Sequence, residues 1–267
     1  MKNSFPQLKN NQTMNLLFIL SLFVASCGGD QPGSTNGQTE TAGDNPSDAS
    51  CFEANTNNPC ALLDLEFIAE AAGADKDEIK VENSAEGRKV SKYERANCTY
   101  SWPSNRKATL IVKAAGREME TKVELKNSIV VGGIDLIDDE SFAKTRTKSP
   151  EAYFERVYGK KSKADREAAK DAISRAEESD ASIDKESADA LSGMVDSEAG
   201  KEAVSGIGDK AVSAVASIKN YTNYRTAQLW VLTGNAVFKV EVDISDDDEA
   251  DLETAMEVAS TVIAGCK

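Results

Sequence analysis

The 267-residue chain contains no histidine. This absence excludes Ser-His-Asp and Cys-His catalysis, histidine-ligated zinc, and the side chain that most often acts as a general base near neutral pH. Basic residues are also scarce: 31 lysines and arginines stand against 45 aspartates and glutamates, which leaves a net charge of −14. Because so acidic a chain repels phosphate backbones and anionic lipid surfaces, we expect no nucleic-acid partner.

Long apolar runs are scarce as well, and the clearest extends from Leu16 to Ala25, after Lys2 and Lys9. As a helix it would span roughly 15 Å, about half of a membrane's hydrocarbon core, so it is typical of a signal peptide rather than a membrane span. The run leads into Val24-Ala25-Ser26-Cys27, which resembles the lipobox of bacterial lipoproteins. The resemblance implies that residues 1–26 are removed and that Cys27 carries diacylglycerol and an acyl chain such as palmitate.

Residues 27–50 are rich in Gly, Ser, Thr, Asn, Gln and Asp and contain almost nothing apolar. Such a segment cannot bury enough surface to offset its ordering entropy, so we expect a flexible tether between the membrane and a folded domain. In Gram-negative lipoproteins an Asp after the acylated cysteine retains the protein in the inner membrane. The residue here is Gly28, which favours the outer membrane of the cell envelope.

The rest of the chain, residues 51–267, is long enough for a single large domain. Its first part predicts a helix over 65–72, with Asp64 as N-cap and Gly73 as the stop. It also predicts two strands, 98–102 and 107–113, joined by a turn at Pro103-Ser104-Asn105.

The character of the sequence changes between about residues 138 and 203, where Ala, Glu, Lys, Asp and Ser dominate. Ser149-Pro150-Glu151 is typical of a capped helix start, and an apolar face follows at Tyr153, Phe154, Val157 and Tyr158. From 164 to 178 the apolar stripe is thin. We therefore predict a polar helical insertion in the domain.

Regular patterning returns near the C-terminus, with strands predicted over 229–233 and 236–244 and a hairpin turn at Gly234-Asn235. Ser245 is the expected N-cap of a final helix with an acidic first turn, which ends at Gly265. Its expected buried face comprises Leu252, Ala255, Met256, Ala259, Val262 and Ile263. Hairpins without strand-helix-strand crossovers indicate an α+β fold, an antiparallel sheet with helices packed on one face.

Three segments of the domain resemble a family of bacterial lipoproteins without an assigned activity, best represented in actinobacteria. They are Asn58-Pro59-Cys60-Ala61-Leu62-Leu63, similar to the family's Pro-Cys-x-Leu-Leu motif; Cys98-Thr99-Tyr100-Ser101-Trp102, similar to its Cys-x-x-x-Trp; and Gly206-Ile207-Gly208-Asp209-Lys210-Ala211, similar to its Gly-x-Gly-Asp-x-Ala. The resemblance covers both ends of the domain but not the insertion. It implies an envelope location and no particular chemistry.

Apart from Cys27, four cysteines remain, an even number in a chain expected to be exported, so two disulfides are expected and three pairings are open. The family resemblance implies Cys60 with Cys98, because the two motifs containing them occur together. Cys51 then pairs with Cys266 by elimination; the rival pairing joins Cys51 to Cys60. The irregular spacing disfavours a metal site.

Candidate catalytic patterns are weak throughout. Ser-x-x-Lys occurs at Ser104, Ser141 and Ser182 without the partner motifs of acyl-serine enzymes. The run Asp243, Ser245, Asp247, Glu249 fails as a calcium loop, because Asp248 and Thr254 stand where Gly and Glu belong. No metal or cofactor is therefore expected.

Other polar and aromatic candidates also have a simpler interpretation. Asp135, Asp138, Asp139 and Glu140 are expected to be a solvated junction rather than a glycosidase pair. Gly206-Ile207-Gly208 is expected to be a turn rather than a phosphate loop. Trp102, Trp230, Tyr221 and Tyr224 could stack on a sugar or peptide, although burial is the ordinary fate of a strand tryptophan.

Two function classes follow from this sequence. The first is a lipid-anchored, non-catalytic envelope module that binds a protein, a peptide or a small ligand. The second is an envelope hydrolase that uses carboxylates alone. The missing histidine and the missing motifs favour the first class. A deep cleft with two facing carboxylates would favour the second.

Overall fold

The computed structural model describes residues 49–87, 94–114, 117–179, 183–197, 200–218, 220–222 and 224–266. The predicted signal peptide and nearly all of the predicted tether lie outside these residues. Two compact units are present: residues 163–195 belong to one, and the remaining described residues belong to the other. No helix among the described residues is long and apolar enough to cross a membrane.

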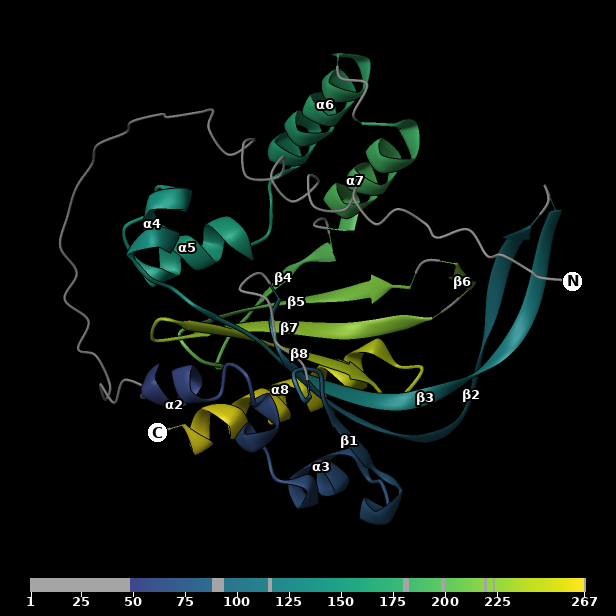
Figure 1. Cartoon of the computed structure of the whole chain (residues 1–267), viewed down its shortest axis with the longest axis vertical. Helices are drawn as coiled ribbons and strands as arrows, with labels where there is room; N and C mark the ends of the chain where they lie inside the picture. Colours follow the sequence, from purple (N-terminus) through teal and green to yellow (C-terminus); the bar gives the residue numbers. More distant parts are fainter. Residues whose placement is uncertain are drawn as a thin grey trace, which may run out of the picture. The chain divides into compact units, whose positions relative to one another are not determined.

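The larger unit is built on an eight-stranded antiparallel sheet (Figure 1). Its order is β1-β2-β3-β8-β7-β5-β4, and β6 pairs with β2. The strands are β1 (Lys80–Asn83), β2 (Asn97–Ala114), β3 (Arg117–Leu136), β4 (Glu202–Val204), β5 (Lys210–Ser217), β6 (Tyr221–Thr222), β7 (Arg225–Thr233) and β8 (Ala236–Asp243). Together with the helices, this sheet confirms the predicted α+β class.

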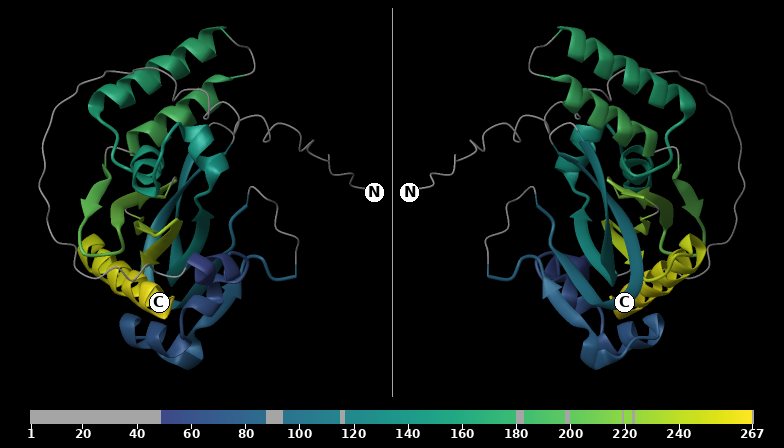
Figure 2. Two further views of the ribbon diagram at one scale, coloured as in Figure 1. Left: turned by 90° about the vertical axis from the view of Figure 1, so that its left-hand side faces the viewer. Right: turned by 90° about the vertical axis from the view of Figure 1, so that its right-hand side faces the viewer.

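The helices that precede the insertion and the C-terminal helix pack against one face of this sheet (Figure 2). They are α2 (Ala49–Ala54), the 3-10 turns η1 (Pro59–Leu62) and η2 (Lys76–Glu78), α3 (Leu65–Ala72) and α8 (Asp248–Gly265). As predicted, Asp64 caps α3, accepting a hydrogen bond from the Glu66 N–H at 2.9 Å, and Gly73 ends it in a left-handed conformation. The N-cap of α8 is Asp247 rather than the expected Ser245, because the Asp247 carboxylate accepts from two N–H groups of the first turn.

The alternation of β8 divides the apolar residues between two clusters, one on each face of the sheet. Phe238 and Val240 join the main core beneath α8, where the ring of Phe52 from α2 stacks on Phe238 at 5.4 Å. Val237 points to the other face, into a smaller cluster with Phe154 of α5. The structure thus adds a second helical layer, at one end of the opposite face, to the single layer expected from sequence.

Four helices lie between β3 and β4, within the predicted insertion: α4 (Asp139–Thr145), α5 (Pro150–Val157), α6 (Lys163–Ser179) and α7 (Lys185–Ser197). The capped start of α5 at Ser149-Pro150 is confirmed. Tyr153 and Phe154 are buried, whereas Val157, expected on the same apolar face, is exposed. α4 and α5 belong to the larger unit, and α6 and α7 form the smaller one around Ile173, Ile183, Ala188 and Leu191.

The predicted turn at residues 103–105 is wrong. β2 is one continuous strand, and a bulge between Pro103 and Lys107 places Ser104, Asn105 and Arg106 opposite a single residue of β3. A bulge absorbs the extra residues and the missing proline N–H without ending the ladder, and it re-aims the side chains that it contains. Its main consequence is the position of Arg106.

Candidate functional site

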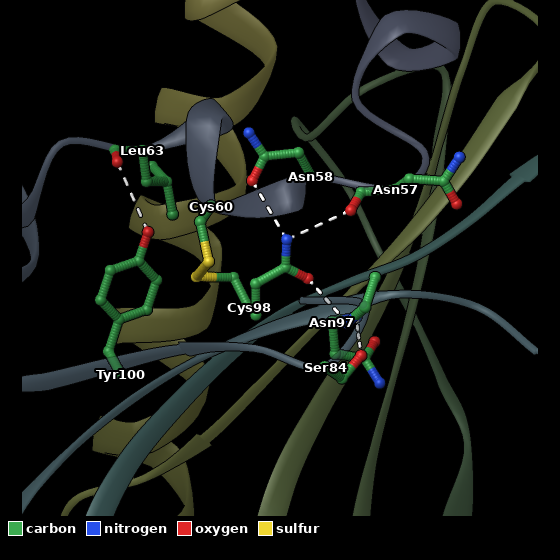
Figure 3. Close-up of a disulfide and its surroundings, with 10 residues drawn as sticks. Asn57, Asn58, Cys60, Leu63, Ser84, Asn97, Cys98 and Tyr100 are labelled. Carbon is green, nitrogen blue, oxygen red and sulfur yellow. Dashed lines mark hydrogen bonds between the residues drawn. A yellow bond between two sulfur atoms is a disulfide. The ribbon is translucent and has the colours of Figure 1, made fainter. Parts of the chain in front are cut away.

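The Asn-Pro-Cys motif forms a brace between η1 and the edge of the sheet (Figure 3). The disulfide Cys60–Cys98 joins η1 to β2, and the second disulfide joins Cys51 to Cys266, so the structure contains the expected pairing. The Asn83 side chain, from β1, donates to the Asn58 side chain and to the Asn57 carbonyl, both at 3.2 Å. The motif thus connects η1 to both β1 and β2.

Tyr100 of β2 lies beside the Cys60–Cys98 disulfide. Its hydroxyl is buried and donates to the Leu63 carbonyl at 3.4 Å (Figure 3). Burial, with a smaller contribution from the charge of Asp64, raises the pKa of Tyr100 to about 12. A phenol held protonated and hydrogen-bonded to backbone contributes to stability rather than to acid–base chemistry.

The Gly-x-Gly-Asp motif contacts the backbone of the β7–β8 hairpin. It is therefore a turn, as predicted, and not a phosphate loop. Gly208 has a φ of +57°, and a Cβ there would lie 2.4 Å from the Leu232 carbonyl oxygen. The Asp209 N–H donates to the same carbonyl at 2.8 Å, and the Asp209 carboxylate accepts from the Gly234 N–H at 2.6 Å. Only glycine permits this approach of the two backbones.

A buried polar cluster is centred on Arg106, the residue that the β2 bulge turns toward the end of β8. The guanidinium donates to the Asp243 carboxylate at 2.7 Å, to the Asp243 carbonyl at 2.9 Å and to the Ser245 carbonyl at 2.7 Å. Its Nε donates to the Asn127 side chain at 3.2 Å. The Asp243 side chain is 2 % exposed, so this charge pair is almost fully desolvated.

A second buried carboxylate, Asp251 on α8, lies beside this pair. It accepts from the Ser245 hydroxyl at 2.8 Å and from the Ile244 N–H at 3.3 Å. Burial raises the pKa of Asp251, and the nearby charge of Asp243 adds to the effect. Burial also raises the pKa of the Tyr224 hydroxyl well above its ordinary value.

A small pocket opens next to the cluster, with a volume of about 30 Å³. Its lining residues are Arg106, Lys107, Leu125, Tyr224, Arg225, Ser245, Asp246 and Asp248. A volume of this size holds one or two waters, far below the roughly 300 Å³ of an ordinary ligand site. Neither Asp243 nor Asp251 lines the pocket, so their carboxylates do not face it as an acid–base pair would.

Asp135 is not the solvated residue that the sequence suggested. Its side chain is 12 % exposed, is paired with Arg95, and accepts hydrogen bonds from the hydroxyls of Tyr153 at 3.0 Å and Tyr158 at 3.2 Å. Burial raises the pKa of both tyrosines, and the Asp135 charge adds to this. The carboxylate therefore anchors α5 to the end of β3.

Asp138 has a separate role from Asp135. It caps α4, and hydrogen bonds from Ser141 lower its pKa. Asp139 and Glu140 are exposed in the first turn of the same helix. Of the four acids at this junction, Asp135 anchors α5 and Asp138 caps α4, whereas Asp139 and Glu140 are solvated.

The remaining sequence candidates take structural positions. Trp102 is buried in the main core, and Trp230 packs beside the second cluster under the ammonium of Lys201, 5.1 Å from the ring centre. Tyr221 and Tyr224 contact each other edge to face at 5.3 Å. Ser104 accepts from the Arg106 N–H at 2.9 Å within the bulge.

Two further candidates concern Ser-x-x-Lys and metal binding. Ser141 donates to the Asp138 cap at 2.8 Å, and Ser182 lies outside the described residues. Within the part of the chain that the structure describes, no group of three or more acidic or cysteine side chains is placed to hold a metal ion.

Sequence reasoning missed Arg106, Asp243 and Asp251 as one cluster. Arg106 was expected just after a turn at residues 103–105, which the structure does not contain, and Asp243 drew attention only as the first residue of a failed calcium loop. The position of Asp251 could have been predicted, because it lies four residues before Ala255 and therefore falls on the buried face of α8.

Comparison of the chain with models of known protein families, with curated proteins and with solved structures finds no match in any of the three. The resemblance to actinobacterial lipoproteins therefore depends on the motifs alone.

Proposed function

We propose that this protein is a lipid-anchored lipoprotein of the cell envelope that acts as a non-catalytic binding module for a protein or peptide. Its buried and half-buried polar side chains support this proposal, because Arg106, Asp135 and Asp251 all bind backbone or neighbouring side chains that stabilise the fold. A carboxylate hydrolase would instead need two acids that face an open cleft.

The observation that carries the proposal is the ribbon formed by β2 and β3. β1 pairs with β2 only as far as Ser101, and β8 pairs with β3 only from Ser128 onward. Beyond these points the two strands continue as a two-stranded ribbon, with β6 beside β2 (Figure 1).

One face of this ribbon is apolar. The strand register places six apolar side chains on it: Ala108, Leu110, Val112, Met119, Val123 and Leu125. Val112 and Met119 are direct cross-strand partners near the tip and are 37 % and 52 % exposed. The exposed part of the stripe is therefore its outer end, and exposed apolar side chains on a projecting ribbon are typical of a surface that docks a partner.

A photo-reactive residue at Met119 should form an adduct with the docked partner in intact cells, because this side chain is exposed on the apolar face. The matched control is the same residue at Glu118, its neighbour on the opposite face. We expect adducts from position 119 and few from position 118. Equal adduct yields at the two positions would show that the apolar face is not the docking surface.

The anchor is tested separately, because Cys27 lies outside the described residues. Several acyl chains, each contributing about 0.8 kcal/mol per buried methylene, would hold the protein on a membrane. We expect Cys27→Ser to move the protein from the membrane to soluble fractions, and mass spectrometry of the parent to find an acylated peptide that begins at residue 27. A membrane-bound Cys27→Ser variant would refute the anchor. The outer-membrane assignment is tested by Gly28→Asp, which we expect to shift the protein to the inner-membrane fraction.

A further inference from the structure

The edge of β3 from Arg117 to Asn127 has no partner strand among the described residues. β2 occupies the other edge of this segment, and the pairing of β8 begins only at Ser128. The side chains from Arg117 to Lys122, Glu124 and Lys126 are exposed. An unpaired strand edge presents a row of backbone donors and acceptors that can pair with another chain.

Charges of alternating sign mark this edge. On the ribbon face opposite the apolar stripe, β3 carries Glu120, Lys122, Glu124 and Lys126 in succession. Among the described residues none of the four has an ion-pair partner. A strand edge that is guarded against pairing carries charges that repel a copy of itself. Here the signs of these four charges alternate, so an antiparallel copy can match each of the four with its opposite, whereas Glu118 at the outer end of the same face meets no charge.

We propose that this edge of β3 pairs with the same segment of a second copy of the chain, antiparallel, about a two-fold axis through Val123. In this register Lys122 lies opposite the partner's Glu124, and Glu120 lies opposite the partner's Lys126. The symmetry repeats both pairs, which gives four cross-strand ion pairs. On the apolar face, Val123 meets the partner's Val123, and Thr121 meets the partner's Leu125.

Neighbouring registers are worse, which makes the proposed one specific. An axis through Lys122 would place Lys122 opposite the partner's Lys122, and Glu120 opposite the partner's Glu124. An axis through Thr121 would place Glu118 opposite the partner's Glu124. Like charges directly opposite one another destabilise a strand pair, whereas opposite charges stabilise it. Self-pairing also has the isologous geometry of most homodimers.

The inference does not depend on the lipid anchor or on the ligand, because the edge belongs to the folded domain. It is tested in the full chain by cysteine cross-linking. Val123→Cys places two thiols at the two-fold axis, roughly 5 Å apart between Cβ atoms, so a reducible dimer should form. Met119→Cys is the control, because it is more exposed yet lies four residues from the axis, which separates the two thiols by roughly 27 Å.

We expect Val123→Cys to cross-link and Met119→Cys to remain monomeric on non-reducing gels. Cross-linking of Met119→Cys with the same yield, or none with Val123→Cys in a folded protein, would overturn the register.

A charge-reversal experiment tests the same interface without new thiols. Lys122→Glu and Glu124→Lys each turn two attractive pairs into repulsive ones, so each variant alone should dimerise roughly tenfold or more weakly than the parent. A mixture of the two variants restores opposite charges at both positions, and heterodimers should form with near-parental affinity. A parent that stays monomeric at high concentration, or single variants that dimerise as well as the parent, would refute the proposal.

Discussion

Replacing both Cys51 and Cys266 with serine is expected to lower the free energy of unfolding by roughly 5 kcal/mol. The bond joins residues 215 positions apart, and in the chain-entropy model a cross-link stabilises a protein by restricting the unfolded chain, more so for longer loops. Because ordinary domains are stable by about 5–15 kcal/mol, this loss is large. Denaturant unfolding of the variant and the parent measures it.

The matched comparison is the double replacement of Cys60 and Cys98, which closes a loop of sequence separation 38. The same model gives about 4 kcal/mol for that loop, so the terminal disulfide should have the larger effect. Non-reduced peptide mapping of the parent is the second check. A peptide that joins Cys51 to Cys60 would contradict the pairing, and unchanged stability of the Cys51/Cys266 variant would contradict the entropy argument.

The second large effect is expected from Arg106→Met, which should destabilise the fold by roughly 3–5 kcal/mol near neutral pH. Methionine preserves much of the side-chain volume but removes the cation that faces the buried Asp243 carboxylate, and an uncompensated buried charge is costly. It also removes the hydrogen bonds to the Ser245 carbonyl and to Asn127. Denaturant unfolding of the variant and the parent measures the loss.

The pH dependence of this variant has a definite sign. In the parent, burial already raises the pKa of Asp251, and the charge of Arg106 opposes that rise. Removing Arg106 raises the pKa of Asp251 further above its unfolded value of about 3.9, so the folded state favours the protonated acid. The variant should therefore be least impaired below about pH 4 and should lose stability as the pH rises through the folded pKa.

Arg225→Met is the control for Arg106→Met. Arg225 pairs with Asp248 at 2.9 Å on the rim of the same pocket, but the two side chains are 52 % and 31 % exposed. Solvent screens such a pair, and its loss should cost no more than about 1 kcal/mol. Equal losses for the two arginines would show that burial of the Asp243 charge is not the cause, and a pH-independent loss for Arg106→Met would contradict the effect on Asp251.

Local patterns predicted several elements well, and each success has a local cause. The helix over 65–72 has its cap and its glycine stop within the sequence of the helix itself. The β7–β8 hairpin has a two-residue turn, and the alternation in β8 reports which of its residues face the main core. Periodicity also identified most of the buried face of α8, but it missed Asp251 and Val258, and it included Leu252 and Met256, which are only half-buried.

Three features were beyond local reasoning because they depend on distant partners. Pro103 looked like a turn residue, but pairing with β3 keeps β2 extended through a bulge. Asp135 looked like one acid of a surface cluster, but Arg95, Tyr153 and Tyr158 bury it. α5 looked like part of a surface insertion, but Phe154 packs on a face of the sheet that the sequence left open.

The sequence by itself determined the α+β class, the capped starts of α3 and α5 and the C-terminal hairpin, because caps, turns and side-chain periodicity act over a few residues. It also predicts the lipid anchor at Cys27, which is read from a local motif. Only the tertiary structure decided where the charges lie. The pairing of Arg106 with Asp243, 137 residues apart, and the free edge of β3 both result from strand register, and register depends on the summed packing of the whole sheet.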